Sequence, residues 1–133
     1  MDKKNLYQNP RIIVVQKLYS HYFNQEEELN FPKHKFKKFI KDVVLGTIER
    51  NELILDELKN KLGDEIILEN FDKVFQTILK AATYEFLYKP NISINIIIKE
   101  YLNSSNFFLE DSQTKYLNAL LDNVGKKLRT SNA

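Results

Sequence analysis

The side chains that could do chemistry in this chain are two histidines, a cluster of lysines and two pairs of neighbouring acids. His21 and His34 lack the spacing of a metal site, and no Ser-His-Asp arrangement is evident. No glycine-rich loop is present to cradle a phosphate. The acid pairs fall at expected helix boundaries, which favours a capping role over acid/base work. They are Asp64 with Glu65 and Glu110 with Asp111. These residues predict a protein that is not an enzyme and that needs no metal and no cofactor.

The densest basic segment is PKHKFKKFIK, residues 32–41. Its lysines are Lys33, Lys35, Lys37, Lys38 and Lys41. Such a cluster suits either a solvated helix start or a contact with nucleic acid, and the residues leave both open. The whole chain carries 20 basic and 18 acidic side chains, a formal net charge of +2. Any nucleic-acid contact must therefore come from local clustering of cations.

Length and composition indicate one domain with one core. The chain has 133 residues, of which 43% are hydrophobic. It has no cysteine, which excludes disulfides and thiolate metal sites and fits a reducing compartment. No apolar run approaches the roughly 18 to 20 residues that span a bilayer, and the start MDKKNLYQNP lacks the apolar core of a signal peptide. We expect a cytoplasmic protein without membrane contact.

Apolar residues recur at intervals of three and four in every long segment, which predicts an all-α fold. Helices are expected over residues 11–23, 36–62, 71–86, 93–104 and 112–128. Pro10 suits the first turn of the first helix, Gly63 ends the second and Pro90 follows the third. The chain reads as a single domain over residues 1–133, with one candidate seam near Gly63.

The segment PNISINIIIKEYL, residues 90–102, is rich in β-branched residues that favour a strand. No other segment alternates cleanly, so a strand here would have no partner. As a helix capped near Ser93, the segment places Ile94, Ile97, Ile98 and Tyr101 on one face. We therefore predict a helix.

Three segments carry patterns beyond helical periodicity. They are RIIVVQKLY (11–19), ILKAATYEFLYKPNISINIIIKEY (78–101) and DSQTKYLNALLDNVGKKLR (111–129). In this order they resemble the opening pattern of the bacterial transcription antitermination factor NusB family, its Tyr-Glu-Leu helix with the following Ile-Asn-Glu helix, and its closing Lys-Phe-Val-Asn-Gly-Val-Leu-Asp segment. The closing match includes Lys115, Tyr116, Asn118, Leu121 and Asp122. The resemblance covers most of the chain.

The resemblance implies two small packed helical bundles and a binding function. Proteins of this family pair with ribosomal protein NusE and hold boxA, a single-stranded segment of nascent RNA, within the RNA polymerase antitermination complex. The resemblance implies RNA contacts at Lys3, Lys4, Arg11, Lys80, Lys115 and Tyr116. It implies partner contacts at Tyr19 and Phe75.

Several of these positions also suit a structural role. Phe75 falls where many relatives carry an acidic residue facing NusE, so it either anchors the partner or turns into the core. Tyr19 and Tyr116 could belong to the core, while Lys3, Lys4 and Lys80 could be plain surface charges. A helical protein-interaction module or homodimer without an RNA role is therefore the alternative function. A NusB-like domain of an RNA methyltransferase is disfavoured, since no large cofactor-binding domain is present.

Overall fold

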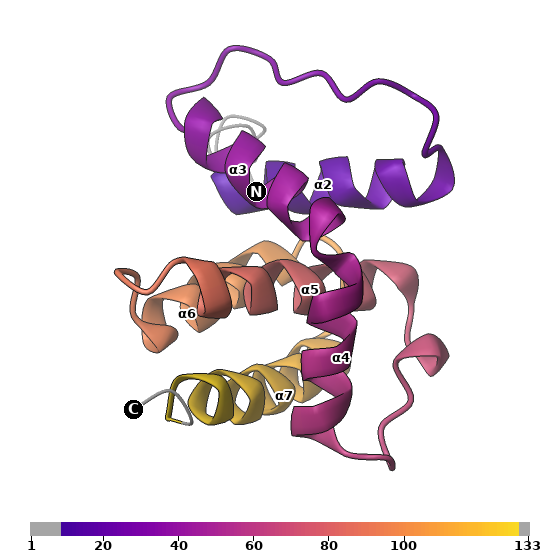
Figure 1. Cartoon of the computed structure of the whole chain (residues 1–133), viewed down its shortest axis with the longest axis vertical. Coiled ribbons are helices and arrows are strands. Elements are labelled where there is room, and N and C mark those ends of the chain that lie inside the picture. The colour runs from indigo at the N-terminus through magenta and orange to yellow at the C-terminus, as the bar shows by residue number, and fades with distance from the viewer. Residues whose placement is uncertain (1–8, 131–133) are drawn as a thin grey trace.

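The computed structural model of the protein describes residues 9–130, which form six α-helices and one short 3₁₀ turn, with no strand among them (Figure 1). The elements are α2 (Pro10–Phe23), α3 (Lys37–Glu49), α4 (Asn51–Leu62), η1 (Leu68–Asn70), α5 (Lys73–Tyr88), α6 (Ile94–Ser105) and α7 (Asp111–Thr130). The all-α prediction is confirmed. No helix in this range is both long enough and apolar enough to cross a bilayer.

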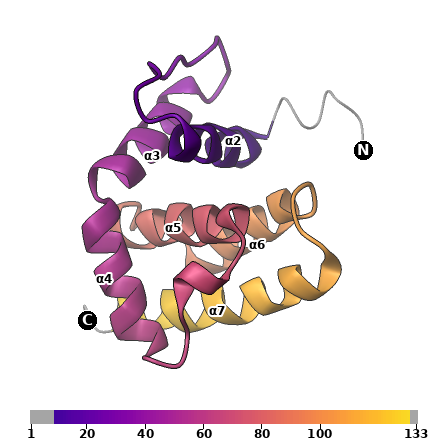
Figure 2. The same ribbon diagram turned by 90° about the vertical axis from the view of Figure 1, so that its right-hand side faces the viewer.

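The helix α5 is the centre of the fold. An unbroken run from Phe75 to Leu79 and another from Ala81 to Phe86 are buried, so α5 is enclosed on nearly all sides. It packs against each of the other five helices. The pair α2 and α3 lies on one side of α5 and α7 on the opposite side, while α4 runs past its edge (Figures 1 and 2).

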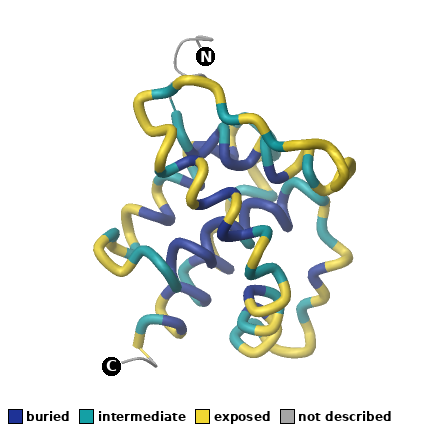
Figure 3. The backbone as a smooth tube through the Cα atoms, turned by 45° about the horizontal axis from the view of Figure 1, so that its top comes forward, coloured by how far each residue is buried: buried dark blue, intermediate teal, exposed yellow. Residues whose placement is uncertain are grey.

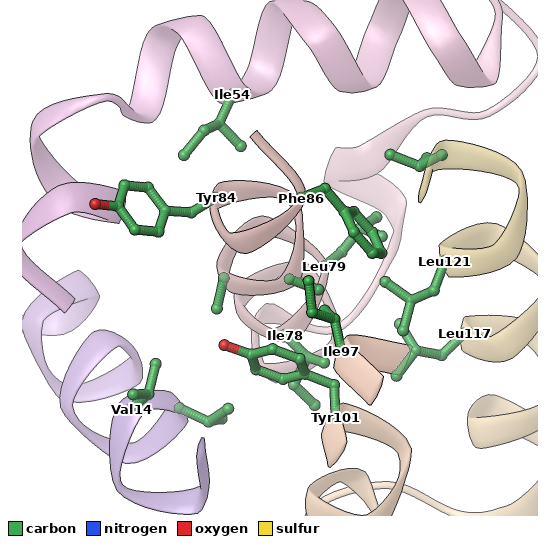
Figure 4. Packing of buried hydrophobic residues seen from close by; sticks show 14 of the residues in the cluster. Val14, Ile54, Ile78, Leu79, Tyr84, Phe86, Ile97, Tyr101, Leu117 and Leu121 are labelled. Atoms are coloured by element: carbon green, nitrogen blue, oxygen red, sulfur yellow. The ribbon is translucent and has the colours of Figure 1, made fainter. Parts of the chain in front are cut away.

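One hydrophobic cluster runs through all six helices, from Val14 in α2 to Leu128 in α7. Figure 4 shows its middle, where Leu79 lies close to Ile97 and to Leu117 and Leu121 of α7. Ile54 and Leu58, which precede Gly63, belong to the same cluster. The buried residues therefore form a continuous core across the candidate seam, with the exposed segments outside it (Figure 3).

The isoleucine-rich segment forms the helix α6, as predicted. The Oγ atom of Ser93 accepts a hydrogen bond from the backbone N–H of Ile96 at 3.2 Å, which caps the first turn. Ile97, Ile98 and Tyr101 are buried against the core. Burial of this face outweighs the modest cost of β-branched side chains in a helix.

The prediction of one helix over residues 36–62 is wrong, because the chain breaks into α3 and α4 at Arg50. Arg50 has φ −104° and ψ 24°, and its guanidinium lies over the ring of Tyr88, 4.6 Å from the centroid. Earlier in α3, Gly46 lies against the ring of Tyr84, where any Cβ atom would clash. No pattern in the neighbouring sequence predicts the break, because the contact that accompanies it is with Tyr88 of α5.

Candidate RNA-binding and partner-binding surfaces

Arg11, expected to contact RNA, lies in the interior. Its Nη2 and Nε atoms donate hydrogen bonds to Glu85 Oε1 at 2.7 Å and to Oε2 at 3.0 Å. The Arg11 side chain is 9% exposed and that of Glu85 is 0% exposed. The rings of Phe39 and Tyr101 flank the guanidinium, with centroids 4.8 and 5.5 Å from Cζ. A guanidinium held this way is not available to a phosphate, so Arg11 joins α2 to α5.

The electrostatics of this pair follow from burial and attraction together. Burial opposes the charge of Arg11, but the hydrogen bond and the charge of Glu85 outweigh it and raise the pKa of Arg11. Burial and the charge of Glu85 raise the pKa of Tyr101 well above its ordinary value. Arg11 is therefore charged and Tyr101 neutral at any physiological pH.

Tyr116 lies on an aromatic cluster that also contains Phe71 and Phe75, called here the Tyr116 cluster. Phe71 and Phe75 stack at 4.7 Å between centroids, and Tyr116 lies 5.6 and 6.2 Å from them. Phe75 is 2% exposed, so its side chain belongs to the core and does not face a partner. Tyr116 is 43% exposed, and its neighbour Lys115 is exposed as well. The Tyr116 cluster therefore exposes part of the Tyr116 ring beside the cation of Lys115.

A second group of aromatic side chains lies at the end of α2. Tyr19, Tyr22 and Phe23 are 40%, 42% and 62% exposed, and we call them the aromatic patch. Phe23 packs edge-on against both tyrosines, at 4.9 and 5.1 Å between centroids. Lys73 of α5 places its Nζ atom 4.4 Å from the ring centroid of Tyr22. Exposed aromatic rings that pack on one another are typical of protein-binding surfaces.

Lys80 is on the side of α5 that faces α2, α3 and α4, apart from the Tyr116 cluster. It lines a cleft of about 280 Å³, called here the α2–α5 cleft. The other lining residues are Leu18, His21, Tyr22, Gln25, Thr47, Ile48, Asn51 and Thr77. Burial, and secondarily the charge of Lys73, lower the pKa of Lys80. None of the ion pairs among the described residues includes Lys80.

Two further groups of basic residues were singled out in the sequence. Lys3 and Lys4 lie outside the described residues. The five lysines of residues 33–41 are exposed along the start of α3 and the segment before it. Within residues 9–130, no group of three or more histidine or acidic side chains is placed to hold a metal ion.

Sequence reasoning missed three features, the roles of Glu85, Phe71 and Lys73. Glu85 could have been predicted to have a buried cationic partner, because it falls in the apolar stripe of α5 and a buried carboxylate needs a cation. Phe71, the first residue of the helix expected over residues 71–86, was not connected with Tyr116, although their ring centroids are 5.6 Å apart. The contribution of Lys73 to the aromatic patch had no local signal, because α2 and α5 are far apart in the sequence.

The fold of the chain has a counterpart among solved structures. It matches a solved structure of NusB from T. maritima with a TM-score of 0.77 and 24% sequence identity, covering 90% of each chain. The sequence then identifies the family, because the model of the NusB family matches residues 8–126. The chain belongs to the NusB family.

Relatives that carry the name transcription antitermination protein NusB differ in how much of their length is matched. The protein from Novosphingobium aromaticivorans is 28% identical over 123 residues, which are 92% of this chain and 82% of the relative. The protein from Sinorhizobium fredii is 32% identical over 92 residues, which are 68% of this chain and 57% of the relative. That of Rhizobium rhizogenes is 25% identical, over 87% of this chain and 72% of its own length.

Proposed function

We propose that this chain is an RNA-binding transcription antitermination factor. In this proposal it holds a boxA-type single-stranded RNA and pairs with ribosomal protein NusE within the RNA polymerase antitermination complex. The relatives' common name supports the first statement, and the family membership supports the choice of RNA and partner.

The observation that carries the RNA proposal is the half-open ring of Tyr116. Single-stranded RNA is bound by stacking its bases on aromatic rings and pairing its phosphates with cations. Tyr116 is 43% exposed and rests on Phe71, which holds the ring in place. Lys115 adds a cation beside it. Arg11 is left out of the proposed surface because Glu85 already engages it.

The aromatic patch supports the partner proposal. Tyr19 is the member expected from the resemblance, and Tyr22 and Phe23 extend the same surface. Lys73 covers part of Tyr22, which makes this patch less suited to stacking a base than Tyr116. The patch also favours the alternative function, a protein-interaction module or homodimer without an RNA role.

Titration with boxA RNA, with and without NusE, tests the proposal. The chain alone offers few cations near Tyr116, so it should bind RNA weakly and with a shallow dependence on salt. NusE should tighten binding at least about tenfold, a coupling of roughly 1.4 kcal/mol. Equal affinity in both states would remove the cooperation, and no preference for boxA in either state would favour the interaction module. Sedimentation of the chain alone would detect a homodimer.

A further inference from the structure

The α2–α5 cleft has features that the RNA and partner contacts above leave unexplained. Two of its lining residues carry a buried side-chain polar atom without a hydrogen-bond partner, Nδ1 of His21 and Oγ1 of Thr47. Thr47 as a residue is only 3% exposed. A buried polar group without a partner costs about 1 to 3 kcal/mol, and folded proteins keep few of them. Two such groups beside one cleft make it a candidate site for a polar group from outside the chain.

The charge of the cleft indicates what that group is. Lys80 contributes an ammonium that forms no ion pair with a described residue, and Lys73 lies close enough to disfavour its charge. Glu69 attracts Lys80 without forming an ion pair with it. Hydroxyl, amide and ammonium groups can all donate hydrogen bonds to an oxyanion. A carboxylate would pair with Lys80 and give Thr47 an acceptor.

The position of the cleft indicates where the carboxylate comes from. Tyr22 lines the cleft and also belongs to the aromatic patch, so the two form one continuous surface. A protein that packs on Tyr19 and Phe23 therefore passes the cleft mouth. Exposed tyrosine and phenylalanine rings are typical anchors of protein interfaces.

A phosphate of an RNA chain fits this cleft less well. It is tethered to a ribose on both sides, whereas a carboxylate ends a side chain and can reach the nearly buried Thr47. The Lys73 ammonium also lies over one face of the Tyr22 ring, so that face is not open to a stacked base.

We propose that the α2–α5 cleft receives an aspartate or glutamate side chain of the protein partner docked on the aromatic patch, with Lys80 as its counter-ion and Thr47 as a hydrogen-bond donor. This inference rests on the proposed pairing with NusE and adds the charge that NusE must bring to this face. It assigns an acidic partner residue to a site whose own charge is positive.

The test measures NusE affinity for the full chain and four variants. Lys80→Glu should weaken NusE binding about tenfold or more, because like charges then meet in a confined site. Lys99→Glu is the matched control, since it makes the same charge change on the exposed face of α6 and should leave affinity unchanged. Exchanging the responsible NusE acid for lysine should restore binding to Lys80→Glu.

Thr47→Val separates binding from folding. Oγ1 of Thr47 has no partner in the free chain, so valine should keep or raise the melting temperature. The same change should weaken NusE binding about fivefold or more, because the carboxylate loses a donor. The fourth variant, Lys80→Met, removes the charge and should weaken binding less than Lys80→Glu.

Each result decides the assignment. Wild-type affinity in Lys80→Glu and Thr47→Val would overturn the cleft assignment while leaving the proposed function intact. Failure of the wild-type chain to bind NusE would overturn the partner in the proposed function, and the cleft assignment with it. Loss of boxA RNA affinity with unchanged NusE affinity in Lys80→Glu would replace the carboxylate by an RNA phosphate.

Discussion

The two ends of α5 differ in how their polar groups are satisfied. At the C-terminal end, Glu85 pairs with Arg11, and Lys89 pairs with Asp42. Arg129 of α7 donates hydrogen bonds to carbonyl oxygens at this end, including that of Phe86 at 3.1 Å. These partners come from α2, α3 and α7, so the C-terminal end is closed by the protein itself.

From its start to Lys80 in its middle, α5 is more open, although Asp72 at its N-cap accepts a hydrogen bond from Gln113 of α7. Lys80 has no ion pair among the described residues, and Tyr116 rests half-exposed on Phe75. Phe23, across from this end on α2, is 62% exposed. In Figure 1, α2 ends on the side of the molecule where α5 begins, so the aromatic patch belongs to this end too. The comparison teaches that residue type alone does not mark a binding surface. Arg11 is engaged inside the protein by Glu85, whereas Lys80 has no ion pair among the described residues.

The largest expected effect comes from breaking the closed end. Glu85→Ala leaves Arg11 buried without a counter-ion and should reduce the free energy of unfolding by about 3 to 5 kcal/mol. Urea unfolding would measure it. The matched control is Asp122→Ala, which breaks the exposed pair with Lys126 and should cost less than about 1 kcal/mol. Equal losses in the two variants would contradict the assignment of Arg11 to the architecture.

The next effect concerns the open end. Tyr116→Ala should weaken boxA RNA binding by about 1 to 3 kcal/mol, the cost of one lost base stack, with the helical spectrum unchanged. Fluorescence anisotropy of labelled RNA would measure it. Tyr19→Ala removes a tyrosine of similar exposure from α2 and should leave the RNA affinity of the chain alone unaltered. If Tyr19→Ala weakened RNA binding as much as Tyr116→Ala, the division between the two surfaces would fail.

The closed end also predicts a loss of stability at alkaline pH. Burial and Glu85 raise the pKa of Tyr101, so it stays protonated in the folded state when the unfolded tyrosine ionises near pH 10. Stability is then fully present below about pH 10 and falls above it, by up to about 1.4 kcal/mol per pH unit. Tyr101→Phe should flatten this decline in urea unfolding at about pH 9 to 11. Tyr84, whose pKa is raised by burial and by Asp42, would retain part of it. Identical slopes in the two proteins would rule Tyr101 out as the cause.

The smallest expected effect concerns Lys80, in comparison with the buried cation Arg11. Burial disfavours the charge of Lys80 in the free protein, so Lys80→Met should change the free energy of unfolding by no more than about 0.5 kcal/mol, or raise it. Calorimetry or urea unfolding would measure the change. A loss comparable to that of Glu85→Ala would mean that Lys80 has an internal partner, and the open end would no longer be open.

The helices could be predicted from the sequence where their signals are local. Ser93 and the face made by Ile97, Ile98 and Tyr101 identify α6 in spite of its isoleucines, because cap and stripe lie within one segment. The break at Arg50 could not be predicted, because its ring contact is with Tyr88 of α5. Local patterns therefore define the helices, whereas long-range contacts decide where one of them is interrupted.

The candidate sites show the same limit. The resemblance pointed to Tyr19 and Tyr116, and both are exposed enough to bind. It also pointed to Arg11 and Phe75, whose environments depend on residues elsewhere in the chain. Arg11 and Glu85 are 74 positions apart, and only the packing of α2 on α5 makes them a pair. Residue type suggests a surface role for an arginine, but burial is a property of the fold.

Arg129 has a consequence for the order in which the molecule is completed. Its guanidinium donates to the carbonyl oxygens of Lys89 at 3.0 Å and Ile92 at 2.6 Å, groups that the end of a helix and its turn otherwise leave to water. Arg129 follows Phe86 by 43 positions. During synthesis the end of α5 lacks these hydrogen bonds until α7 has been made, so we expect it to fray until α7 has emerged from the ribosome. A nascent chain stalled before Arg129 has left the exit tunnel should exchange its amide protons fastest at the turn after Tyr88.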